Sequence, residues 1–328
     1  MIYLDYNATT PTAPAAVDAM IPYLREYHGN PSSTHAMGAV VKAGVTKARA
    51  QVASLLGATP DEIVFTSSGS ESNNHILKGV AHARRDRGDH IITSAVEHPA
   101  IQMPCAFLES KGLHVTRVGV DGYGSVDPDE IRKAITDRTI LISIMHANNE
   151  VGTIQPLAEI SKFAREAGVW FHTDAAQSVG KISTDVNDLG VDFLSLAGHK
   201  VYAPLGIGAI YVRSGIEIEP LIHGAGHEKG RRAGTEAVPN IVALGAAAEL
   251  ARQGTDSELI RNLCVKLHDL LVEALGDRVV LNGHPERRLP NTLNVGFRGM
   301  IGVEILARMP DVAASPGAAC HFSSHEPS

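Results

Sequence analysis

Short apolar runs alternate with longer amphipathic stretches through the middle of the chain. Seven runs rich in β-branched and other apolar residues predict strands, at residues 62–66, 90–93, 114–118, 140–145, 169–173, 193–196 and 207–212. Helical patterns separate several of them, at residues 71–85, 99–110, 128–134 and 157–167. This alternation is typical of an α/β domain with a largely parallel, seven-stranded sheet.

The helix expected from Glu71 has one apolar stripe. Ile76, Val80 and Ala83 recur at spacings of four and three residues. Such spacing places apolar side chains on a single helix face. We therefore expect this helix to pack on the sheet.

The pattern changes after about residue 240. An Ala-rich helix is expected at 241–252, followed by a polar linker near 254–257 and another helix at 258–275. Residues 278–281 and 291–297 then predict strands of a second unit. We place an N-terminal segment at 1–14, a large domain at 15–254 and a small domain at 255–328.

Composition narrows the class of protein. The 328 residues are 44% hydrophobic and 20% charged, which excludes a disordered or collagen-like chain. A net charge of −7 argues against nucleic-acid binding, and the lack of a long apolar run argues against a membrane span. Three scattered cysteines, no signal peptide and no metal-ligand spacing indicate a cytoplasmic protein without a metal site.

A Gly/Ser turn leads from a predicted strand into the helix at Glu71. The segment reads FTSSGSESNN at residues 65–74. Backbone N–H groups at a helix N-terminus bind phosphate, and the Ser70 hydroxyl would add a donor. The alternative is an ordinary capped helix, because Ser and Gly are common at caps.

Two charged residues follow predicted strands. Asp174 ends one strand, where α/β folds place ligands, although it could equally cap a turn. Lys200 follows another strand in Gly198-His199-Lys200, either as a solvated loop charge or as an amine that forms a Schiff base. Together with the Gly/Thr turn that contains Thr235, these residues match the needs of pyridoxal 5'-phosphate.

At this point the chain resembles the fold-type I pyridoxal-phosphate enzymes of the cysteine desulfurase family, with selenocysteine lyase as a close relative. The resemblance rests on YLDYNATTP at 3–11, GNPSS at 29–33, TSAVEH at 93–98, ANNEVG at 147–152, DAAQSVGK at 174–181, GHK at 198–200, RAGTE at 232–236 and LPNT at 289–292. Motifs in this order along the whole chain are highly specific.

The resemblance implies roles for the site residues. Lys200 would hold the cofactor covalently and move protons, Asp174 would pair with its ring nitrogen, and Gln177 would bond its phenolic oxygen. The catalytic set would include His98, stacked on the ring. The remaining cofactor contacts would be Gly69, Ser70 and His199 at the phosphate, Thr235 from a second subunit, and Asn149 at the ring oxygen or the substrate carboxylate.

A cysteine near the end resembles the mobile nucleophile of the family. Cys320 follows Pro316-Gly317-Ala318-Ala319, and a thiolate on such a loop could take sulfur as a persulfide. Without the other motifs, Cys320 would be interpreted as a plain thiol. Cys105 is expected in the core, and His146 and His172 are expected to be buried and hydrogen-bonded.

Two departures from the family pattern affect the substrate. Ala197 stands where many desulfurases have Ser, which removes a phosphate donor and is similar to selenocysteine lyase. Family members also continue for several dozen residues past Ser328, and that stretch supplies an Arg for the substrate carboxylate. The small domain is therefore expected to be incomplete.

The leading hypothesis is a homodimeric cysteine desulfurase that converts L-cysteine to L-alanine. It would hold the sulfur on Cys320 for an acceptor protein such as an iron–sulfur scaffold. One alternative is selenocysteine lyase, acting on L-selenocysteine. Another is a cofactor-binding scaffold or partner protein of impaired activity.

Overall fold

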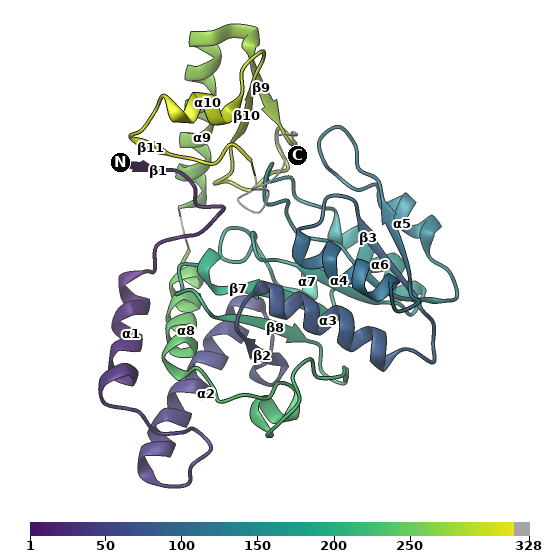
Figure 1. The fold of residues 1–328 in the computed structure, drawn as a ribbon, viewed down its shortest axis with the longest axis vertical. Coiled ribbons are helices and arrows are strands. Elements are labelled where there is room, and N and C mark those ends of the chain that lie inside the picture. Colours follow the sequence, from purple (N-terminus) through teal and green to yellow (C-terminus); the bar gives the residue numbers. More distant parts are fainter. Residues whose placement is uncertain (255, 318–328) are drawn as a thin grey trace.

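The structure is a computed structural model that describes residues 1–254 and 256–317. Figure 1 shows a larger part, built around a central sheet, and a smaller part above it. Helix α8 (Val238–Arg252) belongs to the larger part, and α9 (Ser257–Leu275) begins the smaller one. The predicted domain boundary near residue 254 falls between these two helices.

The central sheet has the seven strands that the sequence predicts, in the order β2-β8-β7-β6-β5-β3-β4. They are β2 (Ile63–Thr66), β3 (His90–Ser94), β4 (His114–Val118), β5 (Thr139–Ser143), β6 (Trp170–Asp174), β7 (Phe193–Ala197) and β8 (Gly208–Val212). Only β8 runs antiparallel to its neighbours in this sheet, so the expectation of a mostly parallel sheet is confirmed.

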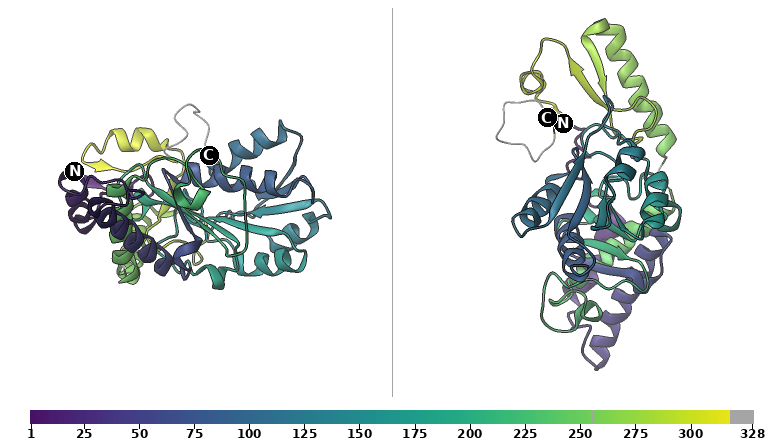
Figure 2. Two further views of the ribbon diagram at one scale, coloured as in Figure 1. Left: turned by 90° about the horizontal axis from the view of Figure 1, so that it is seen from below. Right: turned by 90° about the vertical axis from the view of Figure 1, so that its right-hand side faces the viewer.

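Helices cover both faces of this sheet (Figure 2). One face packs against α3 (Gly69–Ala83) and α4 (Pro99–Glu109), where Cys105 is fully buried as expected. The other face packs against α2 (Ala36–Leu56), α5 (Pro128–Ala134), α6 (Leu157–Glu166), α7 (Val186–Leu189) and α8. Helix α1 (Pro14–Arg25) lies along α8. The two apolar clusters hold the sheet between helical layers.

Local contacts shift several predicted bounds. Strand β5 ends at Ser143 rather than at residue 145, because the Met145 N–H donates to the Glu97 carboxylate at 2.9 Å. Helix α3 begins at Gly69, two residues earlier than expected, because Ser68 caps it. Ile76 and Val80 are buried against the sheet, but Ala83 ends the helix and is exposed, so the stripe is one residue shorter than predicted.

The smaller part combines α9 with short strands from both ends of the described chain. β9 (Val279–Asn282) pairs antiparallel with β10 (Asn294–Phe297), and α10 (Gly302–Ala307) follows. β1 (Ile2–Tyr3) pairs in parallel with β11 (Val312–Ala313), so the chain's first residues lie against this part. The predicted strands at 278–281 and 291–297 are therefore present, with shifted bounds.

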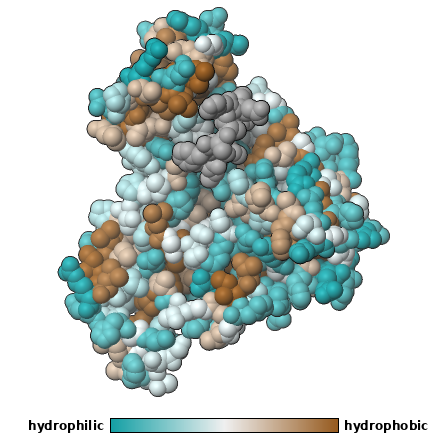
Figure 3. Space-filling view, in the orientation of Figure 1, coloured by the Kyte–Doolittle hydropathy of each residue, from teal (hydrophilic) through white to brown (hydrophobic). Residues whose placement is uncertain are grey.

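The smaller part exposes many apolar side chains. Figure 3 shows them among polar neighbours on its surface. On α9 the exposed set comprises Leu259, Leu263, Val265, Leu267, Leu270 and Val272. Within residues 1–254 and 256–317, no helix is long and apolar enough to cross a membrane.

Candidate active site

Asp174 and Lys200 come to the same edge of the sheet. Asp174 is the last residue of β6, and Lys200 lies three residues beyond the end of β7. The two strands are parallel neighbours, with Asp174 opposite Ser195. Parallel strands present their carboxyl ends at one edge, which is where open α/β sheets bind ligands.

Two hydrogen bonds hold the Asp174 carboxylate. The side chain is only 7% exposed. Its Oδ1 accepts the Ala176 N–H at 2.9 Å, and its Oδ2 accepts the Asn73 side-chain amide at 2.6 Å. Both predictions for Asp174 can therefore hold at once. Its Oδ1 caps the turn, and its Oδ2 is hydrogen-bonded to Asn73 of α3 at the ligand edge.

Lys200 turns inward from the loop after β7. Its half-buried amine donates to the carbonyl oxygens of Asn7 and Ala8, the latter at 2.9 Å. These contacts rule out the alternative of a solvated loop charge. An amine held inside the protein at the same sheet edge as a buried carboxylate matches the requirement for a lysine that binds a carbonyl compound.

Asn7 contacts three of the predicted residues, two through its backbone carbonyl and one through its side chain. Gln177, which is 6% exposed, donates its amide to the Asn7 carbonyl at 2.9 Å. The Asn7 side chain donates to the Asn149 carbonyl at 3.3 Å and to Thr292 Oγ1 at 3.0 Å. The structure thus brings Lys200, Gln177 and Asn149 together through this N-terminal residue.

Both predicted histidines border this edge. His199 Nδ1 lies 3.1 Å from Thr9 Oγ1. Burial and the nearby charges of Lys200 and Lys181 lower the pKa of His199 to about 4, so the ring is neutral at pH 7. His98 caps α4, where its Nδ1 accepts the Ala100 N–H at 3.0 Å, so this nitrogen carries no proton.

The predicted phosphate site is the start of α3. Ser68 Oγ takes the capping role by accepting the Glu71 N–H at 3.2 Å, which leaves Ser70 exposed in the first turn. A Cβ placed on Gly69 would lie 3.2 Å from the Cβ of Ala197, so the helix start approaches the end of β7 closely. Glycine preserves this approach, and the helix N-terminus therefore lies beside the loop that carries Lys200.

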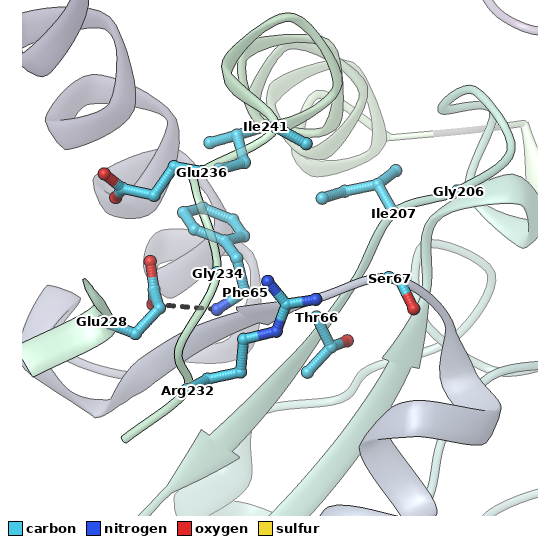
Figure 4. A pocket seen from close by; sticks show the side chains of 11 residues that line it. Phe65, Thr66, Ser67, Gly206, Ile207, Glu228, Arg232, Gly234, Glu236 and Ile241 are labelled. Atoms are coloured by element: carbon cyan, nitrogen blue, oxygen red, sulfur yellow. Dashed lines mark hydrogen bonds between the residues drawn. The ribbon is translucent and has the colours of Figure 1, made fainter. Parts of the chain in front are cut away.

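Thr235 lies on a separate segment over β2. Arg232 anchors this segment through an ion pair with Glu71, with Nε 2.8 Å from Oε1. Figure 4 shows the pocket that the segment forms with Ser67, where the Arg232 side chain projects inward from one wall. Thr235 itself is exposed. Its contact with a second subunit's cofactor stays a prediction.

The expectation of a buried, hydrogen-bonded ring is met for His172 and only in part for His146. His172 is fully buried, with one ring nitrogen 2.8 Å from Ser143 Oγ and the other 3.1 Å from Ser195 Oγ. His146 is also buried, but its Nδ1 has no hydrogen-bond partner among the described residues. Burial lowers the pKa of both rings, so they are neutral structural groups.

Four residues at the site were missed as individual candidates. They are Asn7, Asn73, Glu97 and Lys181, all inside motifs quoted for the resemblance or the phosphate turn. The spacing of four residues between Gln177 and Lys181 could have indicated the contact between their side chains. Cys320, the predicted nucleophile, lies outside the described residues.

Comparisons with known proteins agree with this geometry. The family profile described as aminotransferase class-V matches residues 2–327. A protein of Methanosarcina thermophila named cysteine desulfurase IscS is 49% identical over 331 residues, which cover 100% of this chain and 81% of that protein. A Homo sapiens cysteine desulfurase is 46% identical, with 100% and 72% covered.

Solved structures give the same result for the fold. One described as SspA in complex with cysteine has a TM-score of 0.90 and 38% sequence identity. The match covers 100% of this chain and 92% of that chain. A second, described as a NifS-like protein, has a TM-score of 0.91 and 38% identity, with 95% and 86% covered.

Proposed function

Because the chain belongs to the class-V aminotransferase family, and within it to the cysteine desulfurases, we propose that it converts L-cysteine to L-alanine and transfers the sulfur. Members of this family depend on pyridoxal 5'-phosphate. The cysteine bound to the similar structure SspA supports the choice of substrate.

The residues at the sheet edge fit this cofactor. Asp174 Oδ2 offers a buried carboxylate for the ring nitrogen, and Lys200 offers an amine for the carbonyl carbon. The phosphate would lie at Gly69, Ser70 and His199, with His98 and Gln177 at the ring. When bound, the cofactor supplies an electron-accepting ring that stabilises negative charge on the substrate.

Lys200 and Asp174 would then act on protons. Lys200 can remove and return a proton at the substrate carbons, because it reaches the site on a loop between rigid elements. Asp174 would hold the ring nitrogen in its protonated form, since a buried carboxylate beside a cation favours the charged pair. Water is kept from this carboxylate by its burial beneath α3.

Cys320 would take the sulfur. Its thiolate attacks the sulfur of the bound cysteine, and an S–S bond forms as the substrate C–S bond breaks. The substrate carbon keeps the electron pair and accepts a proton, which yields alanine and a persulfide on Cys320. An acceptor protein, such as an iron–sulfur scaffold, would then receive this sulfur.

The active form would be a homodimer in the cytoplasm. Thr235 is exposed, on a segment that an ion pair holds in place, and it could reach the phosphate of a second subunit. The Asn149 side chain would contact the ring oxygen or the substrate carboxylate, while its backbone carbonyl accepts the Asn7 amide.

The observation that carries this proposal is the inward-facing Lys200 amine at the same sheet edge as the buried Asp174 carboxylate. The test measures alanine and sulfide from L-cysteine, with dithiothreitol to release the sulfur. We expect activity that Lys200→Ala and Cys320→Ala both abolish, and a visible absorbance band that only Lys200→Ala removes.

Other outcomes separate the alternatives. Activity on L-selenocysteine without alanine formation from L-cysteine would identify selenocysteine lyase. A cofactor band without either activity would identify the scaffold protein. Absence of both the band and the activity would refute the proposed function.

A further inference from the structure

Lys181 lies in a tight turn directly behind Gln177. The Lys181 N–H donates to the Ser178 carbonyl at 3.0 Å. Gly180 makes this turn with a φ of +76°, and a Cβ there would lie 2.9 Å from Val201 Cγ2. Only glycine adopts this backbone without strain in so little space. The turn brings the Lys181 side chain back to that of Gln177, which lies four residues earlier in the sequence.

The Lys181 amine contacts the oxygen end of the Gln177 amide. Its Nζ lies 3.2 Å from Gln177 Oε1, while Gln177 Nε2 donates to the Asn7 carbonyl at 2.9 Å. The two ends of a glutamine amide have the same shape, and only their partners decide which end faces a site. A lysine ammonium can donate hydrogen bonds but cannot accept one, so it requires the oxygen end.

The surroundings keep this pair in place. Gln177 is 6% exposed. The backbone carbonyl of Lys181 accepts the Ser257 hydroxyl at 3.2 Å, at the first residue of α9. Burial and the nearby Lys200 charge lower the pKa of Lys181 to about 7, so below that pH the amine is an ammonium that can only donate to Gln177. The Lys181 charge also lowers the pKa of His199.

We propose that Lys181 is a positioning residue that orients the Gln177 amide, so that its NH2 group faces the cofactor's phenolic oxygen as a fixed donor. The inference deepens the proposed function and rests on it. A donor at that oxygen favours its deprotonated form. Without Lys181 only the Asn7 carbonyl still selects this orientation, so a fraction of the molecules presents the amide oxygen instead, which would favour the protonated form.

The first test titrates the visible absorbance of the bound cofactor with pH. Lys181→Met is expected to raise the pH midpoint by about one unit, the effect of one lost hydrogen bond to a charged group. Lys181→Arg, which can also only donate, should keep the midpoint. Lys162→Met, at an exposed lysine of α6, is the matched control and should leave it unchanged.

A double-mutant cycle shows whether Lys181 acts through Gln177. In a Gln177→Met background, Lys181→Met should cause no further shift. An equal shift in both backgrounds would overturn the proposal, because Lys181 would then act directly by its charge. No shift in the single variant would overturn it as well. If Lys181→Met does not fold, Lys181→Gln replaces it, since its amide can both donate and accept.

A cofactor-free measurement separates this inference from the proposed function. The Gln177 side-chain amide can be followed by NMR in protein labelled at glutamine nitrogen, and Gln177→Met assigns the signal. We expect Lys181→Met to move this signal and Lys162→Met to leave it in place. An unmoved signal would contradict the positioning role even if the protein binds no cofactor.

Discussion

The contact between Asn73 and Asp174 allows a quantitative test of the buried site. Asn73 Nδ2 lies 2.6 Å from Asp174 Oδ2, and the two residues are 1% and 7% exposed. Asn73→Asp would place a second carboxylate in this contact. Two buried carboxylates at this distance cannot both be ionised, so one of them keeps its proton to a higher pH.

The cost follows from the size of that pKa shift. A rise of about three pKa units corresponds to about 4 kcal/mol. Because the folded protein then binds a proton that the unfolded chain releases near pH 4, the free energy of unfolding falls as pH rises from about 4 to about 7. Little solvent screening applies, since both side chains are buried.

The assay compares urea unfolding midpoints of the cofactor-free protein from pH 5 to 8. Asn73→Leu is the matched control, because it loses the hydrogen bond without adding a charge. We expect this variant to lose about 1.5–3 kcal/mol at every pH. Asn73→Asp should lose progressively more as pH rises. Parallel pH profiles for the two variants would refute the reasoning.

Three further predictions concern buried groups outside the cofactor contacts. Burial raises the pKa of Glu97 to about 8. The stability that the protonated Glu97 side chain contributes is therefore full below pH 4.5 and lost as pH rises through about 8. Glu97→Gln should flatten the urea midpoint profile between these two pH values. Glu228→Ala leaves the Arg49 guanidinium without the carboxylate that lies 2.6 Å from it, and should lower the free energy of unfolding in urea by about 3–5 kcal/mol. An unchanged midpoint would show that this ion pair does not stabilise the fold. Burial raises the pKa of Cys105 to about 12, so mass spectrometry should find it unalkylated at pH 8 until urea is added, and labelling in the native protein would contradict its burial.

The central sheet could be predicted from the sequence because its strands are short apolar runs bounded by polar turns. The errors at their ends have local causes that pattern alone does not contain. Met145 leaves β5 because its N–H binds the Glu97 carboxylate, 48 residues away in sequence. The start of α3 depends on which of two adjacent serines provides the cap, and Ser68 does so.

The first two helices were not predicted, for different reasons. Helix α2 has a regular buried stripe at Val41, Val45, Ala48 and Val52, but small residues surround it and weaken the contrast between its faces. Helix α1 contains Pro22, which indicates a break in a helix. The spacing of apolar residues therefore predicts helices best where large apolar side chains face a sheet.

The position of a site residue was predictable where it follows from a strand end or a motif, as for Asp174 and Lys200, while their roles stay predictions. It was not predictable where the contact is long-range and made by the backbone. Asn7 meets Gln177 across 170 residues and Lys200 across 193, through its carbonyl oxygen. Any residue type carries that oxygen, so the side chains around it do not reveal the contact.

The N-terminal segment at residues 1–14 contacts both parts of the molecule. Residues 2–3 pair with β11 in the smaller part. A few residues later, the Thr10 N–H donates to the His199 carbonyl at 3.1 Å, and the Asn7 carbonyl binds Lys200 and Gln177. Because one short stretch contacts both parts, the orientation of Asn7 depends on both. The contacts that hold Lys200 and Gln177 therefore depend on the folding of the smaller part as well as on the sheet.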